Sequence, residues 1–176
     1  MFTKINQTSI MKIKSIIVAI ALSIIICSFT SKNKLSIDGA WSLVEVKTIK
    51  PDGSSTSTFP KEGLAIFSGS DFSFCWTSHD FKSRSWALAD SVKLNRFNQS
   101  IVNTGTFTLK DSILTTRAVF AMAPMFSDGG VAKFKCSFSG DTLVLRGLSV
   151  VSSENIAHPA YANGSYFVSK LLRNKK

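Results

Sequence analysis

Few residues in this sequence have the types and spacing that catalysis requires. The 176 residues include two histidines, His79 and His158, and both fall in segments that we expect to be loops, where a histidine is usually a surface residue. The sequence has no Gly-x-Ser-x-Gly elbow for a serine nucleophile, no glycine-rich phosphate loop and no His-Glu-x-x-His zinc motif. We therefore expect no enzyme activity, no cofactor and no metal site.

The eleven acidic residues give no stronger indication of catalysis. Five aspartates stand in turn contexts, where this side chain typically caps backbone amides. A pair of carboxylates acting as general acid and base stays open as an alternative, although no spacing points to one. The five turn aspartates are Asp52, Asp71, Asp111, Asp128 and Asp141.

Two cysteines of the expected β domain, Cys75 and Cys136, are candidates for a disulfide if the protein meets an oxidising compartment. Cys75 alternates with the aromatic residues of its segment, whereas Cys136 lies among the apolar residues of its own. Two cysteines on opposite sides of a sheet do not reach bonding geometry. We therefore expect two free, buried thiols.

The N-terminal segment has the pattern of an export signal. Lys12 and Lys14 precede an almost unbroken apolar run, Ile16 to Ile26, which is shorter than the roughly 20 residues of a membrane-spanning helix. The pattern predicts a signal peptide over residues 1–30 and a polar linker over residues 31–38, with an uncleaved membrane anchor as the alternative. Met11 is an alternative start, since the segment from there on is a complete signal.

Cys27 lies at the end of the apolar run, where a bacterial lipoprotein carries its lipid-modified cysteine. The lipoprotein pattern has a small residue just before that cysteine, and here Ile26 takes its place. Lipidation of Cys27 and ordinary cleavage near Ser28 or Thr30 both stay open. Either outcome predicts an extracytoplasmic protein that is periplasmic, anchored to the envelope or secreted, and a lipid at Cys27 is the one membrane attachment that we expect.

The formal net charge of +10 does not predict a nucleic-acid partner. Three of the lysines lie at or before Lys14 and would leave with the signal peptide, and residues 174–176 form a basic tail. The other basic residues are scattered, without the basic helix or aromatic platform that nucleic-acid binding uses. They predict a solvated basic surface.

Period-two alternation dominates the rest of the chain and indicates β-strands. Residues 72–77 alternate Phe, Phe and Trp with Ser, Cys and Thr, and residues 133–138 alternate three basic or polar residues with Phe, Cys and Phe. Turn sequences such as Pro51-Asp52-Gly53-Ser54 and Ser139-Gly140-Asp141 separate the strands. About eight strands joined by tight turns predict an all-β fold, either a meandering antiparallel barrel or a sandwich.

One stretch, Phe81 to Gln99, lacks this alternation. Trp86, Val92 and Leu94 fit one short helix of two or three turns, which we interpret as a lid or a crossover between strands. The loop 121–130 displays methionines and a phenylalanine, which either gate a pocket at a barrel rim or pack against the lid segment.

Gly39-Ala40-Trp41 at the start of the first strand resembles the Gly-x-Trp motif of lipocalins. The segments LVEVKTIKPDG, LAIFSGSDFS, GTFTLKDSILTT and KFKCSFSGDTLVL are similar, in that order, to the hairpins of bacterial lipocalin-like domains. The resemblance covers Ile37 to Arg173. It implies an antiparallel, up-and-down, eight-stranded lipocalin-like barrel over residues 39–173.

The resemblance also implies structural roles for three residues. In lipocalins the small residue lets the chain enter the closed end of the barrel, and the indole plugs that end. A basic side chain of the last strand lies over the indole as a cation–π pair. Gly39, Trp41 and Arg173 are the matching residues here.

An eight-stranded barrel is large enough to hold one small ligand, as lipocalins do. Strand parity places a set of mainly aromatic side chains inside, where they either line an apolar cavity or fill the barrel as a core. Arg117 is either exposed to solvent or available to an acidic headgroup. The inward set is Phe74, Trp76, Phe107, Leu114, Thr116, Phe120, Phe134, Phe138, Leu145 and Tyr166.

Two functions follow from this architecture. The first is an exported carrier or sensor that binds a small hydrophobic or amphipathic molecule inside the barrel, without catalysis. The alternative is an envelope module with a filled barrel whose rim or face binds another protein or a glycan.

Overall fold

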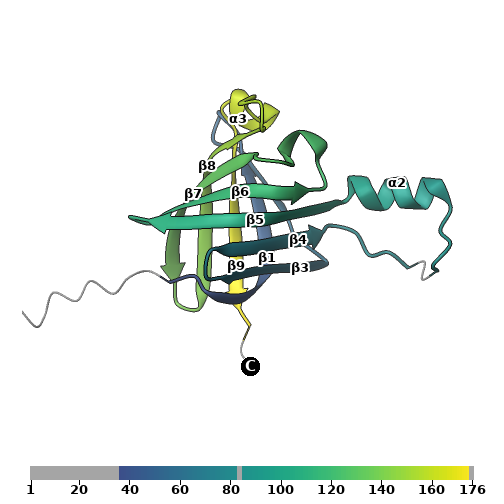
Figure 1. Ribbon diagram of the computed structural model, residues 1–176, viewed down its shortest axis with the longest axis horizontal. Coiled ribbons are helices and arrows are strands. Elements are labelled where there is room, and N and C mark those ends of the chain that lie inside the picture. Colours follow the sequence, from purple (N-terminus) through teal and green to yellow (C-terminus); the bar gives the residue numbers. More distant parts are fainter. Residues whose placement is uncertain (1–35, 83–84, 175–176) are drawn as a thin grey trace, which may run out of the picture. The chain divides into compact units, whose positions relative to one another are not determined.

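The computed structural model describes residues 36–82 and 85–174 (Figure 1). The predicted signal peptide, Cys27 and most of the predicted linker lie outside these residues. Within them, the chain from Ile37 onward forms one compact unit that is mostly β. No helix of the described ranges has the length and apolar character needed to cross a membrane.

The strands form one antiparallel sheet that closes on itself (Figure 1). From β3 to β9 each strand pairs with the next in the chain, and β1 pairs with both β3 and β9. The expected all-β, antiparallel, eight-stranded barrel is therefore confirmed, with β2 as an additional strand. The strands are β1 (Gly39–Ile49), β2 (Ser55–Thr58), β3 (Glu62–Ser68), β4 (Asp71–Thr77), β5 (Ser100–Lys110), β6 (Ile113–Ala121), β7 (Val131–Ser139), β8 (Thr142–Val151) and β9 (Tyr166–Arg173).

Strand β2 was not predicted. It consists of Ser, Thr, Ser and Thr, so it carries no apolar alternation that sequence reasoning could detect. It pairs with the second half of β1, at residues 46–49, while β3 pairs with the first half, at residues 39–42. Two strands therefore share one edge of β1. The edge pairs with β3 over the first half of β1 and with β2 over the second half.

Three short helical elements connect strands: α2 (Asp90–Asn98), the 3-10 helix η1 (Pro124–Phe126) and α3 (Pro159–Ala162). The helix expected between Phe81 and Gln99 is α2, which leads directly into β5 (Figure 1). None of its residues is buried, and Leu94 and Phe97 are exposed. Packing against the barrel therefore contributes little to the stability of α2.

A cluster of fully buried side chains fills one end of the barrel. Trp41 lies at its centre, and its indole Nε1 donates a hydrogen bond of 2.8 Å to the carbonyl of Ile37. Ile37 falls within the predicted linker, yet it is buried. The other large side chains of the described ranges that are fully buried are Leu114, Leu143 and Leu171, and Leu114 also lines the cavity described below.

Arg173 covers this plug from outside. Its guanidinium lies 4.2 Å from the centroid of the Trp41 ring, and its Nη1 donates a hydrogen bond of 2.9 Å to the carbonyl of Asp38. Gly39 has a φ of 126°, and a Cβ at that position would lie 3.1 Å from Arg173 Nη1. The three residues lie together in the arrangement that the lipocalin resemblance implies.

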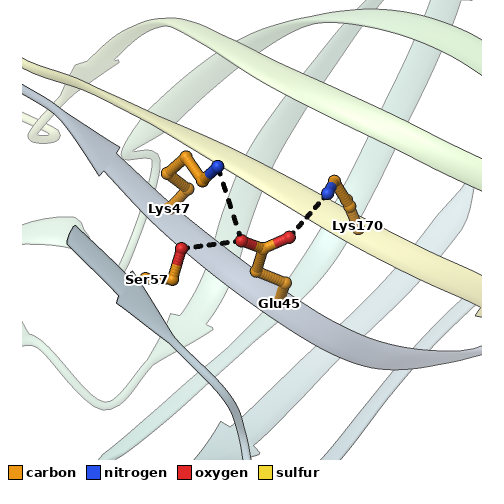
Figure 2. Close-up of polar contacts among 4 residues, drawn as sticks. All are labelled: Glu45, Lys47, Ser57 and Lys170. Carbon is orange, nitrogen blue, oxygen red and sulfur yellow. Dashed lines mark hydrogen bonds and ion pairs between the residues drawn. The ribbon is translucent and has the colours of Figure 1, made fainter. Parts of the chain in front are cut away.

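Glu45 links three strands on the outer face of the barrel (Figure 2). Its carboxylate forms an ion pair of 2.7 Å with Lys170 of β9, accepts a hydrogen bond of 2.7 Å from Ser57 of β2 and lies 3.7 Å from Lys47. The bond with Lys170, and then that with Ser57, lower the pKa of Glu45. The carboxylate therefore joins the closing strand pair β1–β9 to the added strand β2.

Both cysteines of the barrel are free, as expected. Cys136 faces the interior, where burial raises the pKa of its thiol to about 11. Cys75 is only half-buried, because it lies on the outer face of β4 between inward-facing Phe74 and Trp76. The two thiols are thus on opposite sides of the barrel wall.

The packing of the closed end predicts that Trp41→Ala destabilises the protein by about 3–5 kcal/mol, as truncation of a buried aromatic side chain does. Equilibrium unfolding in urea measures this loss. Trp86→Ala is the matched control, because Trp86 is fully exposed, and it should change stability by less than about 0.5 kcal/mol. Equal stabilities of the two variants would contradict the role of Trp41 as a plug.

Candidate functional site: the barrel cavity

The barrel holds a cavity of about 640 Å³ that is partly open to solvent, and its volume is within the range of small-molecule sites. It lies away from the Trp41 plug, because it is lined by the second half of β1 and the first half of β9, whereas Trp41 pairs with Arg173 at the other ends of these strands. The interior of the barrel is thus packed at one end and hollow toward the other.

Apolar side chains form most of the cavity wall. They come from every strand of the closed barrel, because alternate residues of each strand point inward. Sequence reasoning placed Phe74, Trp76 and Phe134 here, and all three line the cavity, together with Leu114, Thr116 and Leu145. The remaining large apolar lining residues are Val46, Phe67, Phe72, Phe97, Ile101, Val102, Met122, Phe126, Val150 and Phe167.

Two of the predicted cavity residues belong instead to other parts of the barrel. Phe107 packs edge-on against Phe67, with 5.3 Å between ring centroids, and does not line the cavity. Phe138 lies 5.9 Å from the Trp41 ring, at the closed end, and is 39% exposed. Neither is in a position to contact a molecule in the cavity.

The predicted inward placement of Phe120 is wrong because of a β-bulge. Gly105 of β5 pairs with Ala118 and Thr104 pairs with Phe120, so Val119 is an extra residue that reverses the alternation. Phe120 is consequently 55% exposed, and Ala121 is buried in its place. Nothing in the local sequence pattern marks the position of this bulge.

The predicted inward placement of Tyr166 is also wrong, by one residue. Phe167 and Ser169 face the cavity, so Tyr166 lies on the outer face, 4.6 Å below the guanidinium of Arg146. A slip of one residue in the assumed register moves every side chain of a strand to the other face.

Arg117 does not reach the cavity. It is exposed on the outer face of β6, between the inward-facing residues Thr116 and Ala118, and its Nη1 donates a hydrogen bond of 3.1 Å to the carbonyl of Gly129. Of the two interpretations of Arg117 from the sequence, the structure therefore supports the exposed side chain over the contact with an acidic headgroup.

Sequence reasoning missed several lining residues that do not follow the alternation of a regular strand, namely Ser78, Ala123 and residues 97–103. Ser78 Oγ donates a hydrogen bond of 2.9 Å to Oε1 of Gln99. Phe97, Asn98 and Gln99 lie in or just after α2, where no period-two pattern identifies inward positions.

An aromatic cluster from α3 closes a gap in the wall between β8 and β9. The pairing of these strands ends at Arg146 and Val168, and the rings of His158, Tyr161 and Phe167 pack there with centroids 5.7–6.2 Å apart. Gly147 makes room for the cluster, because a Cβ there would collide with the Tyr161 hydroxyl. His158 is exposed, as expected for a loop histidine, but no pattern in the sequence connects it with the cavity that it also lines.

The two titratable lining groups of the described ranges are both uncharged near neutral pH. Burial lowers the pKa of His158, and its Nδ1 accepts a hydrogen bond of 3.2 Å from the Ala160 N–H, so the neutral ring carries its proton on Nε2. Burial raises the pKa of Tyr161. No Asp, Glu, Lys or Arg of the described ranges lines the cavity, and those ranges contain no cluster of His, Cys, Asp and Glu that could hold a metal ion.

This arrangement is suited to binding rather than to ionic chemistry. An apolar wall with uncharged polar groups favours ligands that leave water readily and disfavours charged ones. Neither a protein-family model nor a curated protein matches this chain.

Proposed function

We propose that this protein is an exported lipocalin-like carrier or sensor, which binds a small hydrophobic or amphipathic molecule inside its barrel without transforming it. The observation that supports this proposal is the cavity of about 640 Å³ with its largely aromatic and aliphatic wall. The alternative, an interaction module, assumed a filled barrel, whereas this barrel contains a cavity.

Apolar burial is the interaction that would hold such a ligand. Each methylene group that moves from water into the cavity contributes about 0.8 kcal/mol, so about ten buried carbons support binding up to the micromolar range. Aromatic rings such as Phe74, Trp76 and Phe134 add large contact areas at little entropic cost, because their side chains are already held by the strands.

We propose binding rather than catalysis because the two titratable lining groups, His158 and Tyr161, form no hydrogen bond with each other that would make a proton-transfer pair. His158 and Tyr161 pack edge to face, with 6.2 Å between ring centroids, and His158 Nδ1 is engaged by the backbone of Ala160. A general base must lie within hydrogen-bond reach of the proton that it abstracts.

The proposed carrier acts outside the cytoplasm, with residues 1–30 removed as a signal peptide. Fractionation of the native host should recover a protein that lacks these residues, and detergent-phase partitioning should leave it in the aqueous phase. Recovery in the detergent phase that Cys27→Ser abolishes would demonstrate a lipid anchor instead. Full-length protein in the cytoplasm would contradict export.

A second candidate function rests on the exposed apolar residues around α2. Trp86 and Leu94 are exposed and do not line the cavity, and exposed apolar residues of this kind are typical of contacts with another protein or a glycan. This function would use the outside of the molecule, whereas the carrier uses the cavity, so a substitution that fills the cavity separates the two.

Ala132→Trp is that substitution, because Ala132 is buried and lines the cavity. The indole should occupy the ligand space and weaken the binding of the uncharged fluorescent probe N-phenylnaphthylamine by about tenfold or more, which is more than about 1.4 kcal/mol. Fluorescence titration of the purified protein measures the affinity.

Lys133→Trp is the matched control, since the neighbouring side chain on the same strand is exposed on the outer face. It introduces the same indole without filling the cavity and should leave the affinity unchanged. A folded Ala132→Trp variant that binds the probe as well as the original protein would contradict the carrier proposal.

A further inference from the structure

Two buried polar residues, Thr116 and Ser169, lie in the otherwise largely apolar wall of the cavity. Ser169 lies on β9 between Phe167 and Leu171, the neighbouring inward positions, and is 8% exposed. Its pairing partners are Leu145 on β8 and Val46 on β1, and both of these also line the cavity. A hydroxyl at this position therefore has apolar side chains on either side.

No residue of the described ranges hydrogen-bonds the Ser169 hydroxyl. The other buried hydroxyl on the wall, that of Thr116, is satisfied because it donates a hydrogen bond of 3.3 Å to the carbonyl of Ala132. Since buried polar groups in folded proteins are almost always hydrogen-bonded, the Ser169 hydroxyl is available to a partner in the cavity, either water or a polar group of a bound molecule.

Tyr161 is not an alternative anchor. Its hydroxyl also lacks a hydrogen-bond partner among the described residues, but the oxygen is fully enclosed and packs against Gly147 in the gap between β8 and β9. A molecule in the cavity would reach it only after Tyr161 had moved. The polar lining side chains of Ser78 and residues 98–100 are half-buried or exposed and are therefore accessible to water.

No basic residue of the described ranges lines the cavity, and three on the surrounding strands form contacts on the outer face. Arg117 bonds the Gly129 carbonyl, Arg146 lies over Tyr166, and Lys170 pairs with Glu45. A carboxylate inside the cavity would lose its hydration without gaining a cation, which is strongly unfavourable.

We propose that the ligand is an uncharged amphiphile whose single buried hydrogen-bonding group, a hydroxyl or a carbonyl, binds Ser169, while its hydrocarbon part packs against the aromatic wall. Serine both donates and accepts hydrogen bonds, so either group can pair with it. This inference rests on the proposed carrier function and narrows it to neutral ligands, with carboxylates excluded.

Four probes of ten carbon atoms each test the ligand class: decyl alcohol, 2-decanone, 1-decene and decanoate. Each is titrated against the bound N-phenylnaphthylamine at neutral pH, where decanoate is ionised. Decanoate should displace the fluorescent probe at least about tenfold less effectively than decyl alcohol does, because its charge must be desolvated.

Ser169→Ala tests the anchor itself. It should weaken the binding of the alcohol and of the ketone by about fivefold, the effect of losing one neutral hydrogen bond, and leave the binding of decene unchanged. Ser169→Thr retains the hydroxyl and should restore the difference between the alcohol and decene. Ser137→Ala, at an exposed serine on β7, is the control and should change none of the four affinities.

The outcomes separate this inference from the carrier proposal. If decanoate competes as well as the alcohol, or if Ser169→Ala weakens decene and the alcohol equally, the neutral-ligand inference is overturned and the carrier stands. If neither N-phenylnaphthylamine nor any of the four probes binds, both are overturned.

Discussion

The pairing of β1 with β9 closes the sheet, and the interior of this protein depends on that closure. Trp41 pairs with Arg173 and Ile49 pairs with Tyr166, so the two strands run side by side over their whole shared length. Closing eight strands fixes the width of the interior, and the residues that point inward must then fill it or leave it hollow. At the end held by Trp41 they fill it, because an indole and several leucines meet there.

The barrel is hollow beyond the Trp41 plug because several of the inward-facing residues there are small. Gly147, Ala132 and Ser169 are small residues at inward positions, where larger side chains would have filled the cavity or displaced Tyr161. The closure of the barrel also separates charged from uncharged side chains. Inward positions next to the cavity carry apolar or neutral groups, and the cations of the surrounding strands form their contacts on the outer face. An interior of this kind selects a ligand by its lack of charge as much as by its shape.

The sequence predicted those features that depend on regular alternation. Phe74 and Trp76 lie on a strand whose pairings have no register shift, so counting by two places them in the cavity correctly. Phe134 is also placed correctly, because the register shift beside it adds the extra residue Leu148 to β8 and leaves the alternation of β7 unbroken. Counting failed at Phe120, because the bulge at Val119 depends on how Gly105 of the neighbouring strand packs, which is a property of the pair and not of either segment. It failed at Tyr166, because the β9 segment is apolar on both faces and its composition does not distinguish them.

Other parts of the site lie beyond sequence reasoning for different reasons. Strand β2 is polar throughout and forms because β1 offers it a free edge. His158 and Tyr161 reach the cavity through a gap between β8 and β9, which exists only once the barrel has closed. The sequence shows Ser169 as a polar residue in a largely apolar strand. Whether its hydroxyl is available to a ligand depends on the hydrogen bonds of the folded protein, which the sequence does not reveal.

Native mass spectrometry of the protein purified from its own host tests most directly whether the cavity holds a ligand. We expect a population whose mass exceeds that of the chain by one small molecule, and we expect an organic solvent to extract this molecule as an uncharged amphiphile. Protein that is repeatedly isolated without any added mass, and that binds no hydrophobic fluorescent probe, would contradict the carrier.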